Sequence, residues 1–326
     1  MTRHLALSCG LLAAGLFGLV AGHDWLSPAS LWAALSGDPS LQGGLILHWR
    51  LPRVLAAGLV GALLGTGGAI FQGVFRNPLA EPYLLGTAGG GAVGATIALL
   101  LPLGMPPVLA LAGLSFVGAW GATWAVLLVA RLAGGLDTGA LLLAGVSVAA
   151  ILQAIRSGLM LALSDESVSL QVVLSWTLGG IQTPAWDGLA LLAALTTLCL
   201  LLAQRLHRGL DLLGLGDEQA SAFGLDTARF TRLAVLTGAL VVAIAVAWGG
   251  LVAFVGLVAP HLARWTVGVR HGALLPVSAG YGAMLTMLCD GVARAALPPA
   301  EIPLGLVTAL VGGPFFLFVL ARRVRR

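Results

Sequence analysis

The fold of this chain is decided by one stretch, RLPRVLAAGLVGALLGTGGAIFQGVFRNPLAEPYLLGTAGGGAVGA, which occupies residues 50–95. It holds two apolar runs, 54–75 and 84–101, on either side of a polar turn that contains Pro78 and Pro82. A helix of about 20 mostly apolar residues crosses the hydrocarbon core of a bilayer. Proline has no backbone N–H and biases the preceding residue toward extended geometry, so the turn cannot be continuous helix. We therefore predict two membrane spans joined by a non-helical turn.

The remainder of the chain has the same apolar character. Of its 326 residues, 59% are hydrophobic and 9% are charged, and the mean hydropathy is +1.00. A soluble domain carries roughly 25% charged residues, so this chain could not cover its surface in water. Apolar runs lie at 5–22, 54–75, 84–101, 108–130, 140–162, 188–204, 233–248, 251–262, 272–297 and 304–320. We predict a single all-α domain over residues 1–326, a multi-pass protein of the inner or plasma membrane with about ten transmembrane helices.

The first and the eighth of these runs differ from the others. The run at 5–22 could be a cleaved signal peptide, but its apolar core is long and no clean cleavage site follows, so we expect it to be retained. The run at 251–262 is short and ends at Pro260, which indicates a half-length or tilted helix covered by protein or water. The longest polar connections are 23–50, 163–187 and 205–232.

The placement of arginine predicts the orientation, because cytoplasmic loops accumulate positive charge. With the N-terminus inside and ten crossings, Arg156 falls within a span and three arginines lie outside, namely Arg50, Arg53 and Arg294. Thirteen lie inside: Arg3, Arg76, Arg131, Arg205, Arg208, Arg229, Arg232, Arg264, Arg270, Arg322, Arg323, Arg325 and Arg326. We therefore predict that both termini are cytoplasmic.

Composition also excludes several kinds of function. All 17 basic residues are arginine, so the chain has neither the lysine of a Walker A phosphate loop nor that of a Schiff-base enzyme. Cys9, Cys199 and Cys289 lie far apart within apolar runs, without the spacing of metal ligands, and we predict neither a metal nor a cofactor. The net charge of +4 resides in loops between spans, so we do not expect nucleic acid as a partner.

Small residues recur at every fourth position in two of the predicted spans. They are Gly61, Gly65, Ala69 and Gly73 in one, and Gly86, Gly90 and Gly94 in the next. Such stripes let helix backbones approach closely in a membrane, where no hydrophobic force drives helices together. We interpret both stripes as helix-packing surfaces.

Several segments together resemble one transporter family. They are the stretch 50–95, LLLAG at 141–145, LGLGDEQASAFGLD at 213–226, FVGLVAPHLAR at 254–264 and AEIPLGLVTALVGGPFF at 300–316. In this order, over nearly the whole chain, they are similar to the iron-chelate and cobalamin uptake permeases of type II ABC importers, the FecCD-type family. The resemblance implies a ten-helix subunit that forms a homodimer or pairs with a paralogue. It also implies two cytoplasmic ATPase subunits and a periplasmic or lipid-anchored binding protein as partners.

The resemblance assigns a cytoplasmic gate to two places. One is the turn between the second and third spans, where the matching positions are Asn77 and Leu79; a plain tight turn is the alternative. The other is the start of the fifth helix, matched by Thr138 and Gly139, where Asp137 or Thr138 can also cap the helix. A second hydroxyl residue in the cobalamin-type pattern is replaced here by Gly139.

The inside connection 205–232 is predicted to contain one short helix. Asp217 and Glu218 suit a helix N-terminus after Gly216, and Gly224 suits its C-terminal end. Its apolar contacts would be Ala220 and Phe223. In similar importers such a coupling helix docks into a groove of the ATPase; an ordinary surface helix is the alternative.

The arginines at the outer ends of spans require an explanation, because the positive-inside rule disfavours them. In the family, arginines that match Arg50, Arg53 and Arg294 receive acidic residues from the binding protein. The alternative is snorkelling toward lipid phosphates.

Arg156 lies inside the fifth span, with Gln153 one turn earlier. A lipid-facing stripe of this kind would be penalised, so we predict that Gln153 and Arg156 face the translocation pathway. The alternative is that Arg156 snorkels outward or is neutralised by Asp165 or Glu166 in the following connection.

The sequence therefore predicts the permease subunit of an ATP-driven importer of a metal chelate, most simply a ferric siderophore, with ATP hydrolysis on a partner chain. Haem and cobalamin are alternatives on the same scaffold. An ion-coupled secondary transporter would require a carboxylate or histidine near mid-membrane, and the spans offer only Asp290, near an end. Intramembrane enzyme motifs are missing from the spans.

Overall fold

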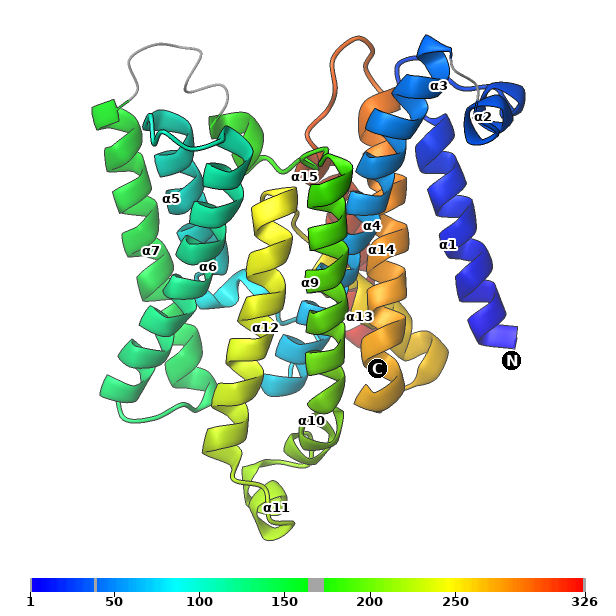
Figure 1. Ribbon diagram of the computed structural model, residues 1–326. Helices are drawn as coiled ribbons and strands as arrows, with labels where there is room; N and C mark the ends of the chain where they lie inside the picture. The colour runs from blue at the N-terminus through cyan, green and yellow to red at the C-terminus, as the bar shows by residue number, and fades with distance from the viewer. Residues whose placement is uncertain (1, 38–39, 164–172, 325–326) are drawn as a thin grey trace.

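The computed structural model describes residues 2–37, 40–163 and 173–324, and these are built from helices and connecting turns (Figure 1). The elements in chain order are α1 (Thr2–Val20), α2 (Pro28–Leu35), α3 (Leu41–Leu45), the π-helical turn η1 (Ile46–Arg50), α4 (Leu51–Val74), the 3-10 turn η2 (Pro82–Leu85), α5 (Thr87–Leu100), α6 (Pro107–Leu132), α7 (Thr138–Leu163), α9 (Trp186–Arg205), α10 (His207–Leu213), α11 (Asp217–Ala222), α12 (Thr227–Gly249), α13 (Val255–Val267), α14 (His271–Ala295) and α15 (Leu304–Val324). The predicted all-α fold is confirmed.

Each predicted apolar run corresponds to a helix. Within the described residues, six helices are long and apolar enough to cross a membrane, and α1, α5 and α15 contain shorter apolar helices. The half-length helix expected near Pro260 is α13, which has 13 residues and therefore spans only about 20 Å. The apolar runs alone thus located the membrane-spanning elements.

The second span begins earlier than predicted, because residues 43–50 were assigned to a polar connection and are helical. An unbroken helical stretch runs from Gly43 to Val74. Its π-helical turn η1 lies directly before Pro52, and the N–H of Leu51 donates to the carbonyl of Ile46. The wider turn accommodates a proline that cannot donate its own hydrogen bond. It also fixes Arg50 and Arg53 on a rigid helix.

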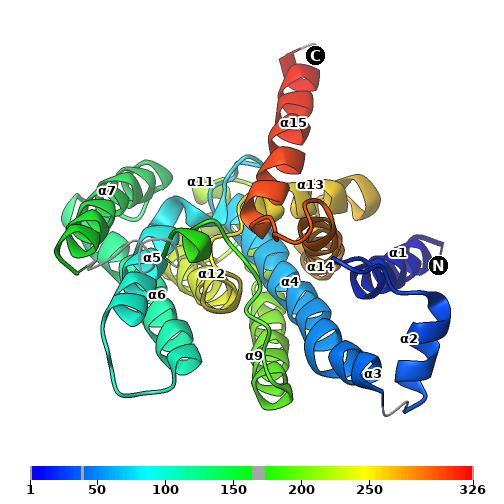
Figure 2. The ribbon, with the colours of Figure 1, turned by 90° about the horizontal axis from the view of Figure 1, so that it is seen from above.

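Glycines of both predicted stripes form close helix contacts, whereas Gly86 lies in the turn before α5 and makes none. A Cβ added to Gly61 would lie 2.2 Å from the carbonyl oxygen of Gly282 on α14, and one added to Gly65 would lie 2.2 Å from that of Ser278. On α5, a Cβ added to Gly90 would lie 2.1 Å from the carbonyl oxygen of Gly118 on α6. Larger side chains would push these helices apart, so glycine sets their spacing. The seam between α4 and α14 is the centre of the molecule (Figure 2).

Two breaks in the helices contact one another beside α4. One is the turn 75–86, and the other is 250–254, where Phe254 has a φ of 65°. The hydroxyl of Tyr83 donates to the carbonyl of Val252 at 3.0 Å, and the N–H of Phe254 donates to the Glu81 carboxylate at 3.3 Å. Non-helical backbone within an apolar protein is stable when its polar groups are paired in this way.

The helix α13 starts later than the predicted run and continues past Pro260 instead of ending near it. A proline in a helix leaves the carbonyl four residues earlier without its usual donor. Here that carbonyl belongs to Gly256, and the side-chain amide of Gln72 lies 3.4 Å from it and donates to it. Gln72 thereby replaces the missing backbone bond, which allows the helix to reach Val267.

The connection 205–232 contains two short helices, α10 and α11, where one was predicted. Figure 1 shows α11 projecting from one end of the molecule, and both chain termini lie toward that same end. Seen along the helix axes, α7 and α15 stand at the periphery while α4, α12 and α14 occupy the centre (Figure 2).

Candidate functional site

The predicted gate turn is held by its own side chain. The Asn77 carboxamide oxygen accepts from the N–H of Leu79 at 3.0 Å, and the Asn77 carbonyl accepts from the N–H of Ala80. Arg76, directly before the turn, adopts a left-handed φ of 49°. Asn77 is exposed and Leu79 half-buried. The turn is therefore stabilised by its own side chain, and Asn77 remains accessible at the surface.

The second predicted gate element is the first turn of α7. Asp137 is the capping residue, because its carboxylate accepts from the N–H of Gly139 at 2.9 Å and of Ala140 at 3.1 Å. Thr138 and Gly139 are therefore the first residues of the helix. Further along α7, Gly145 lies against η2: an added Cβ would be 2.1 Å from the carbonyl oxygen of Leu84. The helix α7, which carries the second predicted gate element, therefore packs against η2, which follows the first.

The predicted coupling helix is α11. It begins after Gly216, which has a φ of 103°, and it is followed by Gly224 with a φ of 85°. Ala220 is buried against the rest of the protein, whereas Phe223 is 69% exposed. The two residues predicted as apolar contacts therefore differ, because one is buried and the other is exposed. Ala220 anchors the helix, and Phe223 offers an aromatic side chain to the outside.

Two polar contacts attach α10 and α11 to the membrane helices. Arg76, beside the gate turn, lies 3.1 Å from the carboxylate of Asp217 on α11. The Asp211 carboxylate on α10 accepts from the backbone N–H of His271 at 2.9 Å and lies 2.7 Å from its Nδ1. Asp211 therefore caps the start of α14. The sequence shows each of these residues, but no local spacing predicts either pair.

Arg294 is buried, with 6% of its side chain exposed. It pairs with Asp290 one turn earlier on α14 at 3.0 Å, an (i, i+4) spacing that suits an ion pair within one helix. Its guanidinium also donates to the carbonyls of Gly18 at 2.6 Å and Ala21 at 2.8 Å, at the end of α1. A side chain engaged in this way does not present its charge to a partner, which argues against a direct docking role for Arg294.

Arg50 acts at the same helix end. It donates to the carbonyls of Leu19 at 3.3 Å and Val20 at 3.4 Å, and to the Asp24 carbonyl at 2.8 Å. The last carbonyls of a helix have no partner within it and carry partial negative charge. Together with Arg294, Arg50 neutralises residues 18–21 at the end of α1. These hydrogen bonds to the end of α1 account for the positions of Arg50 and Arg294 without snorkelling toward lipid.

Arg53, one turn into α4, binds two carboxylates. Its Nε lies 3.2 Å from Asp290, and its Nη2 lies 2.9 Å from Glu301 in the segment before α15. A cavity of about 210 Å³ adjoins it. The cavity is lined by Gly22, His23, Trp49, Arg50, Arg53, Thr183, Arg294 and Glu301. The predicted docking arginines are therefore brought together around one small, positively charged recess.

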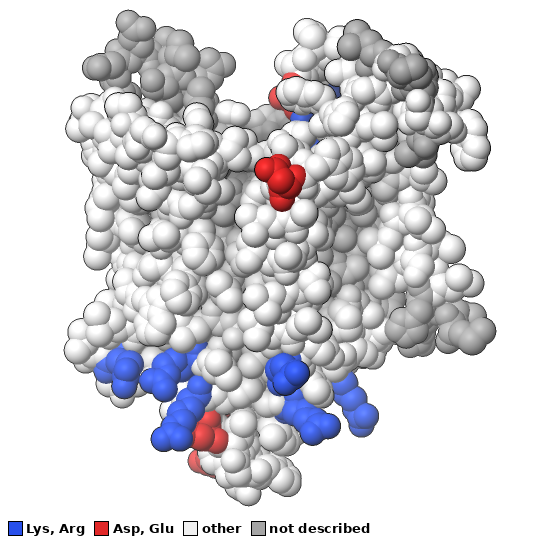
Figure 3. All heavy atoms as spheres, viewed as in Figure 1, with Lys and Arg blue, Asp and Glu red and all other residues white. Residues whose placement is uncertain are grey.

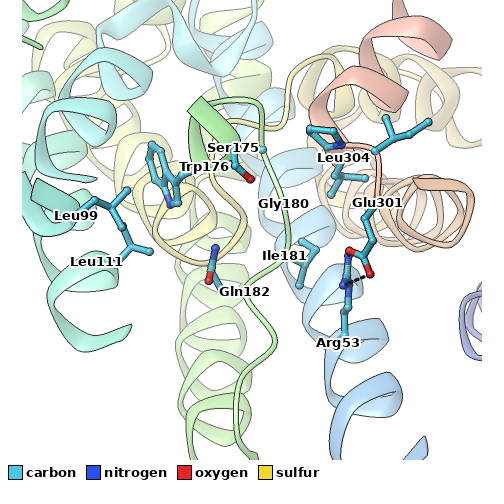
Figure 4. Close-up of a pocket in the computed structure, with 13 residues that line it drawn as sticks. Arg53, Leu99, Leu111, Ser175, Trp176, Gly180, Ile181, Gln182, Glu301 and Leu304 are labelled. Atoms are coloured by element: carbon cyan, nitrogen blue, oxygen red, sulfur yellow. Dashed lines mark hydrogen bonds and ion pairs between the residues drawn. The ribbon is translucent and has the colours of Figure 1, made fainter. Parts of the chain in front are cut away.

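A larger cavity, of about 490 Å³, lies on the other side of Arg53 (Figure 4). Arg53 and Glu301 form one edge of it, and Trp176 and Leu111 face them across the space. The indole N–H of Trp176 is buried and has no hydrogen-bond partner in the described part of the chain. The cavity therefore combines an ion pair on one side with an apolar and aromatic wall on the other.

The structure separates Gln153 from Arg156, which were predicted to share one polar face. Gln153 is exposed, whereas Arg156 is 7% exposed and donates to the Thr177 hydroxyl at 2.6 Å. That hydroxyl in turn donates to the carbonyl of Val173. These contacts hold Arg156 against the residues just before α9. The alternative partners Asp165 and Glu166 lie outside the described residues.

Comparison with known proteins supports a single family. The model of the FecCD transport family matches residues 10–322. The chain is 36% identical to the hemin transport system permease protein HmuU of Yersinia pestis over 301 residues, 91% of this chain and 89% of that protein. It is 38% identical to the vitamin B12 import system permease protein BtuC of Escherichia coli O17:K52:H18 over 323 residues, 98% of this chain and 95% of that protein.

A solved structure agrees with these relatives. A metal-chelate type ABC transporter in an inward-facing conformation matches this fold with a TM-score of 0.84 at 31% identity, and the match covers 98% of both chains. The apolar helices likewise fit a multi-pass membrane protein. The chain belongs to the FecCD transport family and is a membrane permease of the ABC importer class.

Proposed function

We propose that this chain imports a metal chelate, with a ferric siderophore as the first candidate substrate. The observation that carries the proposal is the family match over residues 10–322, on a chain that contains no lysine for a phosphate loop. Energy must therefore come from another chain or from an ion gradient, and the similarity to relatives named transport system and import system permeases favours a partner ATPase. Haem and vitamin B12 are supported equally, because the named relatives carry them.

Coupling to an ATPase is assigned to α11. Its exposed Phe223, its acidic first turn with Asp217 and Glu218, and its position at the projecting end of the molecule support docking into a partner's groove (Figure 1). Figure 3 shows a band of arginine side chains around this end. Such a band is typical of a cytoplasmic face, so we place α11 and both termini in the cytoplasm.

The gate is assigned to Asn77, Leu79, Thr138 and Gly139, with Gln153 on the exposed face of α7. A second copy of the chain, or a paralogue, would cover α7 and α15, which stand apart from the central helices (Figure 2). Both carry large exposed apolar side chains, among them Leu143 at 71% and Leu310 at 74% exposure. The pathway would then lie between two copies, closed by the two gate elements of each.

Docking of a binding protein is assigned to the outer recess at Arg53. Its three arginines are balanced by only two carboxylates, Asp290 and Glu301, and the remaining positive charge favours an acidic side chain. Arg50 and Arg294 shape the recess through their contacts with the end of α1. Arg53 is the residue that we expect to contact the partner.

The test is uptake into proteoliposomes that contain the permease, its ATPase and its binding protein, the latter two identified from the neighbouring genes. Ferric siderophore, haem and cobalamin are supplied separately, with ATP inside or outside the vesicles. We expect uptake of one chelate only with ATP on the α11 side. Uptake driven by a proton or sodium gradient without ATP would instead establish a secondary transporter.

A further inference from the structure

The three outer arginines differ in what holds them. Arg50 and Arg294 donate to backbone carbonyls at the end of α1, which cannot leave without unwinding that helix. Arg53 is held by two carboxylates, and these differ in exposure: the side chain of Asp290 is 1% exposed, and that of Glu301 is 53% exposed. Glu301 lies in the non-helical segment that precedes α15. Arg53 therefore has one fixed partner and one partner that can move away into solvent.

The Arg53–Glu301 pair also stands between the two outer cavities. Both residues line the recess of about 210 Å³ and the larger cavity of about 490 Å³. The pair is bidentate, with nitrogen–oxygen distances of 2.9 and 3.2 Å, and Figure 4 shows it at the edge of the larger cavity. Removal of the Glu301 side chain from Arg53 would take away part of the wall that the two cavities share.

We propose that Glu301 is an internal occupant of the anion site at Arg53, and that a carboxylate of the binding protein displaces it. The proposal rests on the docking assigned above. While the outer face is free, Glu301 neutralises Arg53 and keeps the cavities apart. Docking exchanges one carboxylate for another, so the charge of the site is conserved while the wall opens. Entry of substrate into the larger cavity is thereby linked to the presence of the partner.

The segment that carries Glu301 connects the recess to other elements. The N–H of Ile302 donates to the carbonyl of Ala293 on α14, and the N–H of Gly305 donates to the carbonyl of Leu178, each at 3.0 Å. Leu304 begins α15 and also lines the larger cavity. Displacement of Glu301 would therefore act on the first turn of α15 and on the wall formed by the segment 179–182.

The test measures association of the permease–ATPase complex, in lipid nanodiscs, with the purified binding protein of the same importer. An internal competitor lowers apparent affinity by the fraction of time that it occupies the site. Glu301→Gln removes the competing charge and should tighten association roughly three- to tenfold. Arg53→Gln should weaken association at least threefold. Asp187→Asn, which removes an exposed carboxylate at the start of α9, is the matched control and should change nothing.

A second readout does not need the partner. In a Cys9→Ser background, Gln182→Cys places a thiol in the larger cavity, and a positively charged methanethiosulfonate added outside should label it faster in Glu301→Gln despite the lost negative charge. Glu301→Asp keeps the charge and should leave association within twofold of the unaltered protein, which controls for folding.

The outcomes separate this inference from the docking on which it rests. If Arg53→Gln weakens association while Glu301→Gln weakens it or leaves it unchanged, docking stands and the displacement is wrong. If Arg53→Gln changes nothing, both are wrong. A Glu301→Gln effect that disappears in nanodiscs without anionic lipid would assign the site to lipid headgroups and also overturn the proposal.

Discussion

The two ends of the molecule use arginine in opposite ways. At the end that carries α10 and α11, arginines form an exposed band (Figure 3), and residues such as Arg208 and Arg270 are exposed. At the other end, Arg294 is buried, and Arg50 and Arg53 are partly buried. Each of these three is bound to carbonyls or carboxylates of the same chain.

This difference shows what the positive-inside rule does and does not cover. The rule concerns unpaired positive charges in loops, because membrane insertion retains such loops on the cytoplasmic side. An arginine that neutralises a helix end or a carboxylate contributes to packing, and it is tolerated on either side. Arg50, Arg53 and Arg294 therefore contribute to packing whether or not they also bind a partner.

Arg294→Met should produce the largest effect. It breaks a buried ion pair and frees the carbonyls of Gly18 and Ala21, so we expect the free energy of unfolding to fall by about 3 kcal/mol or more. Thermal unfolding in detergent measures the change. Asp290→Asn combined with Arg294→Met should cost less than the sum of the two single changes. If Arg294→Met lowered the free energy of unfolding no more than Arg208→Met does, the two ends would not differ in how they use arginine.

Arg156→Met should have the next largest effect. Arg156 lies in a span and donates to Thr177, and a bond from a charged donor contributes roughly 1.5–3 kcal/mol. We expect a loss near the lower figure in the same thermal assay, with little loss of uptake. Thr177→Val is the matched change and should be non-additive with Arg156→Met. Preserved stability together with lost uptake would instead place Arg156 in the pathway.

Breaking the Arg76–Asp217 pair should affect coupling more than stability. The pair is partly exposed, with side-chain exposures of 35% and 56%, so its contribution to stability is about 0.2–1 kcal/mol. It joins the gate turn to the helix assigned to the ATPase. Arg76→Asp should therefore reduce transport per ATP hydrolysed in proteoliposomes. The double change Arg76→Asp with Asp217→Arg should restore transport, and failure to restore it would assign Arg76 another role.

Arg208→Met should have the smallest effect. An exposed surface change typically shifts the free energy of unfolding by less than about 0.5 kcal/mol. Orientation should also persist, because the other inner arginines remain. Single cysteines at Ser36 and Gln219 should be labelled by an impermeant reagent from opposite sides of the membrane in both proteins. Labelling from the same side would overturn the predicted topology.

Much of the fold could be predicted from local pattern. Run length located the helices, the two prolines located the turn at Asn77, and the four-residue spacing of glycine located the seams around α4. Asp137 was recognisable as a helix cap for the same reason, because a cap and the N–H groups that it binds are only a few residues apart. The pair Asp290–Arg294 is similarly local.

The errors also have a physical cause. The sequence placed residues 43–50 in a loop because they include polar residues, whereas the π-helical turn before Pro52 extends the span. It ended a span near Pro260 because it could not show that Gln72, far along the chain, bonds the carbonyl of Gly256. It also could not show that Arg156 reaches Thr177, because that contact joins two separate segments.

The sequence by itself determined the class of the protein, its spans and the segments that identify the family, because these depend on composition and on spacings within one helix or turn. Only the tertiary structure decided the roles of the outer arginines. The end of α1, Arg50 and Arg294 come from three distant parts of the chain, and so do Arg53, Asp290 and Glu301. Their contacts exist only once α4 and α14 have packed along their glycines, because that close approach brings these groups within hydrogen-bonding distance.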